Sequence, residues 1–301
     1  MEKIKAVFVG TGMIGAGLAA NAACHDFDVT LYDVVDTEQI YKNFEKVLSL
    51  LVDASVITKE KKTEILENTT YSNHLEEAVS NVDFIQECVP ERLELKGDIY
   101  KKIQTVTGNA AIIASSTSAI YPSKLQQGAL YPECIVVGHP YNPSYLLPLV
   151  EVCGGELVPE HILNRVCEIY TAMGKVPVIC RKERPGFIVN QLSWGAMEAA
   201  QTCVKEGICS VEDVDKAIMY GPGMRMAVTG QLLTISLGID GGFRAAAQKY
   251  GKEPSEDDIL YTDGVDAEIA NRPVEKGNTV ETVCKYRDQM LADILRLHGL
   301  L

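Results

Sequence analysis

The feature that most constrains this chain is a glycine-rich turn that directly follows an apolar run near its start. Residues 4–9 (Ile-Lys-Ala-Val-Phe-Val) are rich in β-branched and aromatic side chains, which predicts a buried strand. Gly10, Gly12 and Gly15 follow at once in the spacing G-x-G-x-x-G. Residues 16–23 are small enough for a helix that packs closely on a strand. Because glycine-rich turns are common, the elements that flank this motif decide its interpretation.

A second short strand is predicted over residues 28–32, and it ends at Asp33. Strand, glycine turn, helix, strand and acid in this order predict a dinucleotide-binding βαβ unit. The turn residues expected to contact the cofactor are Gly10, Thr11, Gly12, Met13, Ile14 and Gly15. We expect Asp33 to hold the ribose hydroxyls of an adenosine. Since residues 34–36 (Val-Val-Asp) offer no Arg or Lys for a 2′-phosphate, the cofactor is predicted to be NAD rather than NADP.

Composition narrows the function classes. A chain of 301 residues is long enough for two domains, and its net charge of −13 disfavours a nucleic-acid partner. No apolar run approaches the ~20 residues of a membrane-spanning helix, and no signal-peptide pattern is present, so no membrane partner is expected. Nine cysteines without a C-x-x-C pair indicate reduced thiols in the cytoplasm and no zinc site, so we expect no metal.

Alternating strand and helix patterns predict the overall fold class. We expect a helix over 37–67, a helix over 93–106, and strands over 82–86, 111–115, 135–138, 147–152 and 176–180. This alternation predicts an α/β fold with a Rossmann-type, doubly wound, mostly parallel sheet. The strand pattern stops after Cys180, which predicts an all-helical second domain. The expected division is residues 1–183 for the NAD-binding domain and residues 184–301 for the helical domain.

Three local patterns refine the expected helical domain. Pro185 is predicted at the first position of a long apolar helix over 186–205. Ser210 with Asp213 three residues later is typical of a capping box at a helix start. The polar stretch 251–278 is expected to be loop.

A histidine and a glutamate stand out as candidates for acid–base chemistry. His139 ends the apolar run 135–138, and ligands of open α/β sheets bind beyond the carboxyl ends of strands. Glu151 lies within the apolar strand Leu149-Val-Glu-Val152, where a buried carboxylate needs a partner. If the two strands are neighbours, Glu151 orients the imidazole as in hydrolytic triads. The alternatives are an ordinary strand-end histidine and a glutamate on a solvent-facing strand surface.

Several further motifs together resemble the 3-hydroxyacyl-CoA dehydrogenase family. They are Met-Ile-Gly-Ala after the glycines, Glu87-Cys-Val-Pro-Glu91 with Lys96, Ser115-Ser-Thr-Ser118, Gly138-His-Pro-Tyr-Asn-Pro143, Leu149-Val-Glu151 and Arg184-Pro-Gly-Phe-Ile-Val-Asn190. The resemblance covers nearly the whole chain, in order. It implies a Rossmann domain followed by a helical domain that mediates homodimerisation.

The resemblance also implies roles for single residues. His139 is implied to be the catalytic base and Glu151 its partner. Ser118 and Asn190 are implied to hydrogen-bond the substrate oxygen. The residues implied to lie near the nicotinamide half of NAD are Glu91, Lys96, Ser118 and Asn142. Without the resemblance, Ser118 would read as a loop serine and Asn190 as an exposed helix amide.

Two departures place the chain away from the acyl-CoA members. His139-Pro-Tyr-Asn-Pro143 stands where those enzymes have His-Phe-Phe-Asn-Pro, and Gly221-Pro-Gly-Met-Arg225 replaces a Tyr-Pro-Met-Gly-Pro segment. Both look more like the L-gulonate 3-dehydrogenase (lambda-crystallin) and L-carnitine dehydrogenase branch. An arginine such as Arg225 can hold a carboxylate bidentately, although a salt bridge or subunit contact is an equal alternative.

These observations predict a NAD-dependent L-3-hydroxyacid dehydrogenase acting on a small polar 3-hydroxy carboxylate. The first alternative is an L-3-hydroxyacyl-CoA dehydrogenase. The residues 59, 61 and 62, all lysines, could then contact the CoA phosphates. An alternative of another class is a non-catalytic NAD(H)-binding structural or sensor protein of the lambda-crystallin kind.

Overall fold

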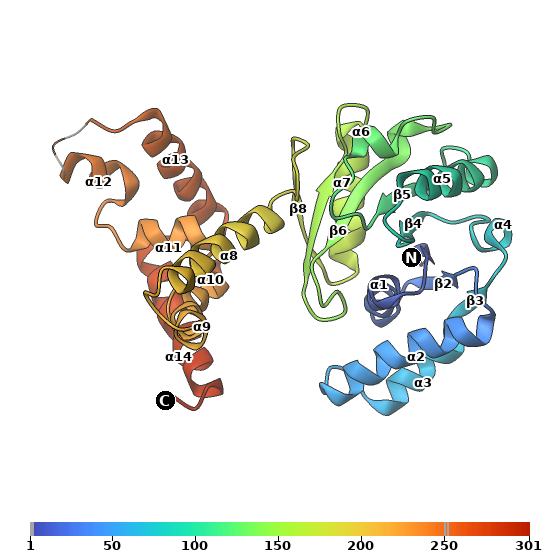
Figure 1. The fold of residues 1–301 in the computed structure, drawn as a ribbon, viewed down its shortest axis with the longest axis horizontal. Helices are drawn as coiled ribbons and strands as arrows, with labels where there is room; N and C mark the ends of the chain where they lie inside the picture. The colour runs from blue at the N-terminus through green and yellow to red at the C-terminus, as the bar shows by residue number, and fades with distance from the viewer. Residues whose placement is uncertain (1–2, 250, 252) are drawn as a thin grey trace. The chain divides into compact units, whose positions relative to one another are not determined.

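The computed structural model describes residues 3–249, 251 and 253–301. The chain divides into two compact units, Met1–Gly195 and Ala196–Leu301 (Figure 1). The sequence places the change at Glu183, and that domain boundary stays a prediction. In chain order the strands and helices of the first unit are β1 (Lys5–Val9), α1 (Met13–Cys24), β2 (Asp28–Tyr32), α2 (Thr37–Asp53), α3 (Lys59–Asn68), β3 (Thr70–Ser72), α4 (Leu75–Ala78), β4 (Phe84–Glu87), α5 (Leu93–Thr107), β5 (Ile112–Ser115), α6 (Pro122–Leu125), a 3-10 turn (Pro132–Cys134), β6 (Ile135–Pro140), β7 (Leu149–Cys153), α7 (Glu160–Ala172), β8 (Val176–Ile179) and the start of α8 (Val189–Lys205).

The strands of the first unit form one sheet, which confirms the predicted fold class. Within the described residues it has eight strands in the order β3-β2-β1-β4-β5-β6-β7-β8. All neighbouring pairs are parallel except β6 with β7. The chain order reverses between β1 and β4, so the loops after these two strands border a crevice where open α/β sheets bind ligands.

Side chains alternate between the two faces of this sheet, and each face carries its own core. On β1, Phe8 belongs to the core that is shared with α1, α2 and α7. Its neighbours Val7 and Val9 belong to the opposite core, which includes Tyr100 of α5 and Leu125 of α6. Burial on both faces explains why the parallel strands read as continuous apolar runs.

The second unit is entirely helical over its described residues, as the sequence predicts. Beyond the end of α8 it contains α9 (Val211–Tyr220), α10 (Pro222–Thr229), α11 (Gln231–Leu237), α12 (Gly242–Lys249), α13 (Glu256–Asn271), a 3-10 turn (Val274–Lys276) and α14 (Val280–Leu297). A small apolar core joins α11, α13 and α14 through Leu233, Val265, Ile269 and Val283. The predicted helix start at Ser210 is confirmed, because its Oγ accepts from the Asp213 amide at 3.0 Å.

Three expectations about individual elements are wrong. The helix expected over 37–67 is interrupted between α2 and α3, where Ser55 takes a left-handed φ of 58° and Thr58 caps α3. Pro185 does not begin α8, because Gly186 and Phe187 take positive φ angles and the helix starts at Val189.

The third error is the polar stretch 251–278. It contains α13, which a capping box at Ser255 and Asp258 starts. Residue 252 of that stretch lies outside the described residues. The short edge strand β3 has no strong sequence signal and was not expected.

Candidate active site

The glycine turn after β1 has the geometry that a dinucleotide requires. Gly10 takes a φ of +97°, and a Cβ there would lie 2.7 Å from the carbonyl oxygen of Cys88. A Cβ on Gly15 would lie 2.0 Å from the oxygen of Gly10, so α1 packs on the turn only because this position is glycine. A Cβ on Gly12 would meet no atom within 4 Å. Gly12 therefore faces the open space that a pyrophosphate needs.

The first turn of α1 and the acid after β2 complete this cofactor cradle. Gly12 is the N-cap of α1, which carries Met13 and Ile14 in its first turn, and no side chain caps the helix. Its amide groups and dipole are thus available to phosphates. Asp33 Oδ2 accepts from the amide of Thr11 at 2.7 Å and from its hydroxyl at 2.9 Å. This arrangement places the Asp33 carboxylate beside the glycine turn and fits NAD.

His139 and Glu151 lie directly opposite each other on the antiparallel strands β6 and β7. His139 Nδ1 lies 2.8 Å from Glu151 Oε2, and the two side chains are 8% and 1% exposed. The predicted contact between these residues is confirmed. The antiparallel turn-back of β7 creates it, because it sets the two residues in register across one strand pair.

The second carboxylate oxygen of Glu151 fixes the start of α8. Oε1 accepts from the backbone amides of Ile188 at 2.7 Å and Val189 at 2.8 Å. An ionised carboxylate only accepts hydrogen bonds, so Nδ1 of His139 carries the proton and Nε2 is left as the basic nitrogen. Phe187 packs beside the imidazole, with ring centroids 5.8 Å apart.

Nε2 of His139 has no partner among the described residues, yet it is not sealed off. The described side-chain atoms that are buried without a partner are Asn21 Oδ1 and Gln126 Oε1, and Nε2 is not one of them. An imidazole that is fixed at Nδ1 and free at Nε2 can accept a proton from a bound hydroxyl group.

The loops after β4 and β5 bring three other predicted residues together. Lys96 Nζ lies 3.3 Å from Glu91 Oε2. Glu91 Oε1 accepts from the amide of Ser118 at 3.2 Å. Lys96 is only 1% exposed, whereas the Glu91 side chain is 42% exposed. Of the predicted pair, Glu91 is therefore the residue that faces solvent.

The remaining predicted residues are placed separately. Ser118 and Asn142 are exposed, and Asn190 is half-buried in the first turn of α8. The structure gives no contact between these side chains and His139 within the described residues. Arg225 is exposed on α10 in the second unit. The roles of all four residues stay predictions.

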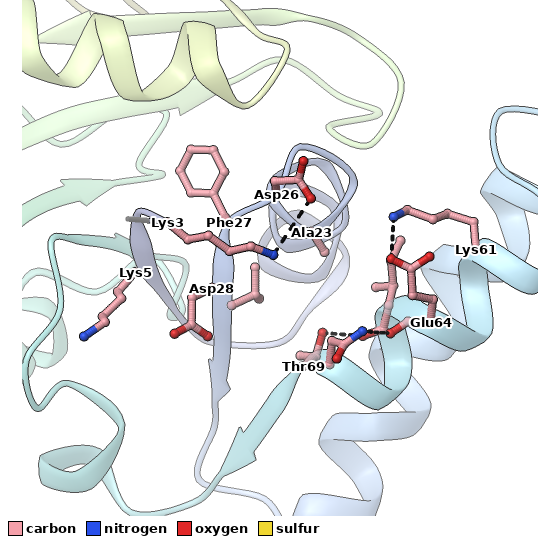
Figure 2. Close-up of a pocket in the computed structure, with 12 residues that line it drawn as sticks. Lys3, Lys5, Ala23, Asp26, Phe27, Asp28, Lys61, Glu64 and Thr69 are labelled. Carbon is pink, nitrogen blue, oxygen red and sulfur yellow. Dashed lines mark hydrogen bonds and ion pairs between the residues drawn. The ribbon is translucent and has the colours of Figure 1, made fainter. Parts of the chain in front are cut away.

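A separate hollow lies at the amino ends of strands β1 and β2 (Figure 2). Its volume is about 390 Å³. Lys3 pairs with Asp26 at 3.9 Å and Lys61 with Glu64 at 2.8 Å, so cationic and anionic side chains pair there. This hollow lies at the amino end of β1, whereas the glycine turn follows its carboxyl end, and Lys61 is the one residue in its lining that the sequence analysis singled out.

The sequence analysis gave no role to one buried carboxylate at the carboxyl end of the sheet. Glu87, the last residue of β4, is fully buried and bonded to Lys96 at 2.8 Å. The signal that identifies Glu151, a carboxylate within an apolar strand, also applies to Glu87.

None of the described helices is long and apolar enough to span a bilayer.

Comparisons with known proteins identify the family of this chain. Residues 5–184 match the family model described as 3-hydroxyacyl-CoA dehydrogenase, NAD binding domain. Residues 186–279 match the model described as 3-hydroxyacyl-CoA dehydrogenase, C-terminal domain.

Named relatives and solved structures lie in the same group. The L-carnitine dehydrogenase of a Pseudomonas species is 34% identical, over 97% of this chain and 92% of the relative. That of Oceanobacillus iheyensis is 36% identical, over 82% and 80%. The crystal structure of a 3-hydroxyacyl-CoA dehydrogenase from Archaeoglobus fulgidus has the same fold, with a TM-score of 0.72 over 99% of this chain and 100% of that chain at 22% identity. The chain therefore belongs to the 3-hydroxyacyl-CoA dehydrogenase family and is a NAD-dependent oxidoreductase acting on a CH–OH group.

Proposed function

We propose that the chain oxidises a small, polar L-3-hydroxy carboxylate, with L-carnitine as the first substrate to test, and that His139 is its general base. The observation that carries the proposal is the buried contact of His139 Nδ1 with Glu151 at 2.8 Å, which leaves Nε2 without a partner among the described residues. The curated relatives named L-carnitine dehydrogenase support the substrate class.

The proposed chemistry divides the C–H and O–H bonds of the alcohol between cofactor and protein. The glycine turn, the first turn of α1 and Asp33 would hold NAD, which would supply the hydride acceptor for the hydroxyl-bearing carbon. His139 Nε2 takes the hydroxyl proton, so the substrate leaves as a ketone and the imidazole becomes an imidazolium. Glu151 stabilises that cation, and in the reverse direction His139 returns the proton. A positioned base of this kind contributes about 10²–10⁴-fold to the rate.

The other predicted residues have positioning roles in this proposal. Ser118 and Asn190 hydrogen-bond the substrate oxygen, while Glu91, Lys96 and Asn142 serve the nicotinamide end of the cofactor. The guanidinium of Arg225, which is exposed on α10, binds the substrate carboxylate bidentately. These roles rest on the family resemblance, and Ser118, Asn142 and Arg225 are in addition exposed.

Charge pairing on α2 and α3 favours a free acid over a CoA thioester. Lys62 Nζ lies 3.0 Å from Glu45 Oε1 and also donates to Ser49. Lys61 Nζ lies 2.8 Å from Glu64. Two of the three lysines that could meet CoA phosphates are therefore engaged by carboxylates. A CoA phosphate would have to displace these carboxylates from the lysines, which lowers its net binding energy.

A substrate panel tests the proposal. NADH formation is measured with L-carnitine, L-gulonate, L-3-hydroxybutyrate and L-3-hydroxybutyryl-CoA. We expect a free acid to give the highest kcat/KM. Arg225→Ala should raise KM for that acid at least ~10-fold, as loss of a bidentate charged contact requires. Arg296→Ala, which removes an exposed arginine of the same unit paired with Asp293, is the matched control and should leave KM unchanged.

Two other outcomes identify the alternatives. A kcat/KM several orders of magnitude higher for the thioester would favour the acyl-CoA reading. Lack of turnover across the panel, with NADH binding intact, would favour the non-catalytic cofactor-binding reading.

We also infer that the chain is a homodimer in the cytoplasm. The second unit exposes large apolar side chains, among them Ile208 at 67%, Val211 at 63% and Leu260 at 65%. Such surface is usually covered in oligomers, and a second copy of this chain is the expected partner. All nine cysteines are free thiols, which suits a reducing compartment. Light scattering should give a mass near twice that of the chain, and a monomer mass at micromolar concentration contradicts the dimer.

A further inference from the structure

The loop 141–148 joins the two strands that carry the proposed catalytic pair. β6 ends one residue after His139, and β7 begins two residues before Glu151. The amide of Tyr141 donates to the carbonyl oxygen of Leu149 at 3.2 Å, so the two ends of the loop stay together. A movement of this loop therefore acts directly on the strand ends beside the pair.

Helix α1 contacts this loop through three of its residues. The Ser144 hydroxyl donates to the carbonyl oxygen of Ile14, in the first turn of α1, at 3.3 Å. The side-chain amide of Asn21 donates to the carbonyl oxygen of Tyr145 at 3.2 Å. A Cβ on Gly17 would lie 2.3 Å from Ser144 Oγ, so this close approach requires a glycine. The helix that starts at the glycine turn thus contacts the loop that follows the proposed base.

Lys175 holds the same loop from a second place in the fold. It lies between α7 and β8 and is 5% exposed. Its ammonium donates to the carbonyl oxygen of Ser144 and to that of Leu147, the latter at 3.0 Å. The amide of the next residue, Val176, donates to the carbonyl oxygen of Pro148 at 2.8 Å. Ser144 is therefore bonded twice, through its hydroxyl to α1 and through its carbonyl to Lys175.

The charge of Lys175 is not explained by stability alone. Burial lowers the pKa of this lysine to about 8, so the buried ammonium weakens the fold at neutral pH. An apolar side chain of similar length would avoid that penalty. It could not donate to the two backbone carbonyls, and Ser144 is itself fully buried. What the ammonium supplies is a fixed position for the loop.

We propose that Lys175 is a positioning residue for the oxidation step. Its ammonium fixes the loop 141–148, and the loop in turn fixes His139 relative to α1, whose first turn is proposed to hold the cofactor. The inference rests on the proposed function in taking His139 as the base. In this proposal Lys175 contacts neither substrate nor cofactor, and it acts only through the loop.

Lys175→Met tests this proposal, because methionine is similar in size to lysine and has no donor. Misplacing a catalytic group by about 1 Å costs up to about 10²-fold in rate, so we expect kcat for NADH formation to fall about 10–10²-fold. KM and the NADH dissociation constant should stay within about threefold of the parent, because the groups proposed to bind substrate and cofactor are unchanged.

Lys175→Gln is the second variant, because its amide keeps N–H donors without the charge. Its kcat should fall less than that of Lys175→Met, but still at least ~3-fold. It also serves as the test if the methionine variant is insoluble.

Val79→Ala is the matched control for stability. Val79 is fully buried in the core on the opposite face of the sheet from Tyr145 of the loop. The cavity left by this substitution should lower the melting temperature and leave kcat unchanged.

Hydrogen–deuterium exchange of the loop gives a readout that needs no substrate. The amides of Leu146 and Leu147 donate to the carbonyl oxygen of Pro143 at 3.0 and 2.9 Å. In Lys175→Met they should exchange at least ~10-fold faster than in the parent, because the loop opens locally. In Val79→Ala their exchange should match the parent.

Two results overturn the proposal. One is a Lys175→Met protein with a lowered melting temperature and a parental kcat, which indicates a purely structural lysine. The other is unchanged exchange of the loop amides, which indicates that Lys175 does not hold the loop. Failure of the proposed function is distinguishable, because His139→Ala then forms NADH at the parental rate. The exchange measurement still shows whether Lys175 holds the loop.

Discussion

Glu151→Gln is the most informative single change, because glutamine keeps the size of glutamate and alters only its hydrogen bonding. Oε1 of Glu151 accepts from two backbone amides, at 2.7 and 2.8 Å, and Oε2 faces His139 Nδ1. The glutamine oxygen must stay on the amides, since two buried N–H groups would otherwise lose their acceptor. The NH₂ group then faces Nδ1 of His139.

A donor at that position inverts the histidine tautomer. Nδ1 must become the acceptor, so the proton moves to Nε2, the nitrogen that our mechanism uses as a base. A wrong tautomer of this kind costs about 10⁴-fold in kcat in serine proteases, and a lost general base costs about 10²–10⁴-fold. We therefore expect kcat for alcohol oxidation to fall 10²–10⁴-fold. Stability should fall by only about 1–3 kcal/mol, because the amides then bond to a neutral acceptor.

The assay compares kcat for NADH formation with the NADH dissociation constant and the urea midpoint of the same samples. Glu151→Ala is the contrasting variant. It leaves two amides and an imidazole without their acceptor, so it should be destabilised by about 3–5 kcal/mol as well as inactive. A Glu151→Gln enzyme that turns over within ~3-fold of the parent would refute the role assigned to the pair.

Two further predictions concern the cofactor turn and a buried lysine. Gly15→Ala should weaken NADH binding at least ~10-fold, because its Cβ would lie 2.0 Å from the Gly10 oxygen. The control Gly97→Ala on α5, whose Cβ would meet no atom within 4 Å, should stabilise the protein by roughly 0.5–1 kcal/mol. Equal NADH affinity in both variants would contradict the role of the glycine turn in cofactor binding. Burial lowers the pKa of Lys175 from 10.5 to about 8, while Nζ donates to the carbonyl oxygens of Ser144 and Leu147. The unfolded chain binds this proton more tightly than the folded one. The buried ammonium therefore destabilises the fold by its full amount below about pH 8, and this destabilisation decreases as pH rises toward 10.5. The free energy of unfolding from urea titrations should therefore favour the parent over Lys175→Met by up to ~3 kcal/mol more at pH 10 than at pH 7. A difference that does not change with pH would show that burial does not perturb the pKa of this amine.

Much of the first unit follows from patterns that are local in the sequence. The strand at residues 4–9, the three glycines and Asp33 lie within one continuous βαβ unit, so their spacing alone determines their geometry. The contact of His139 with Glu151 was also predictable, because a carboxylate within an apolar strand requires a partner.

What escaped prediction depends on contacts between distant segments. The amides of Ile188 and Val189 both donate to Oε1 of Glu151, about forty positions earlier in the chain. This contact makes α8 begin after Pro185 rather than at it. The interruption between α2 and α3 follows from the left-handed Ser55, which no periodicity reveals. The polar composition of 251–278 concealed α13, whose helix start is set by the capping box at Ser255.

The measurement that tests the account most directly is the rate of NADH formation by His139→Ala, with the substrate that the parent oxidises best. The account predicts a kcat at least ~10²-fold below the parent, with an NADH dissociation constant within about twofold, because His139 handles the proton and the glycine turn holds the cofactor. A variant that forms NADH at the parental rate would contradict His139 as the base and, with it, the proposed mechanism.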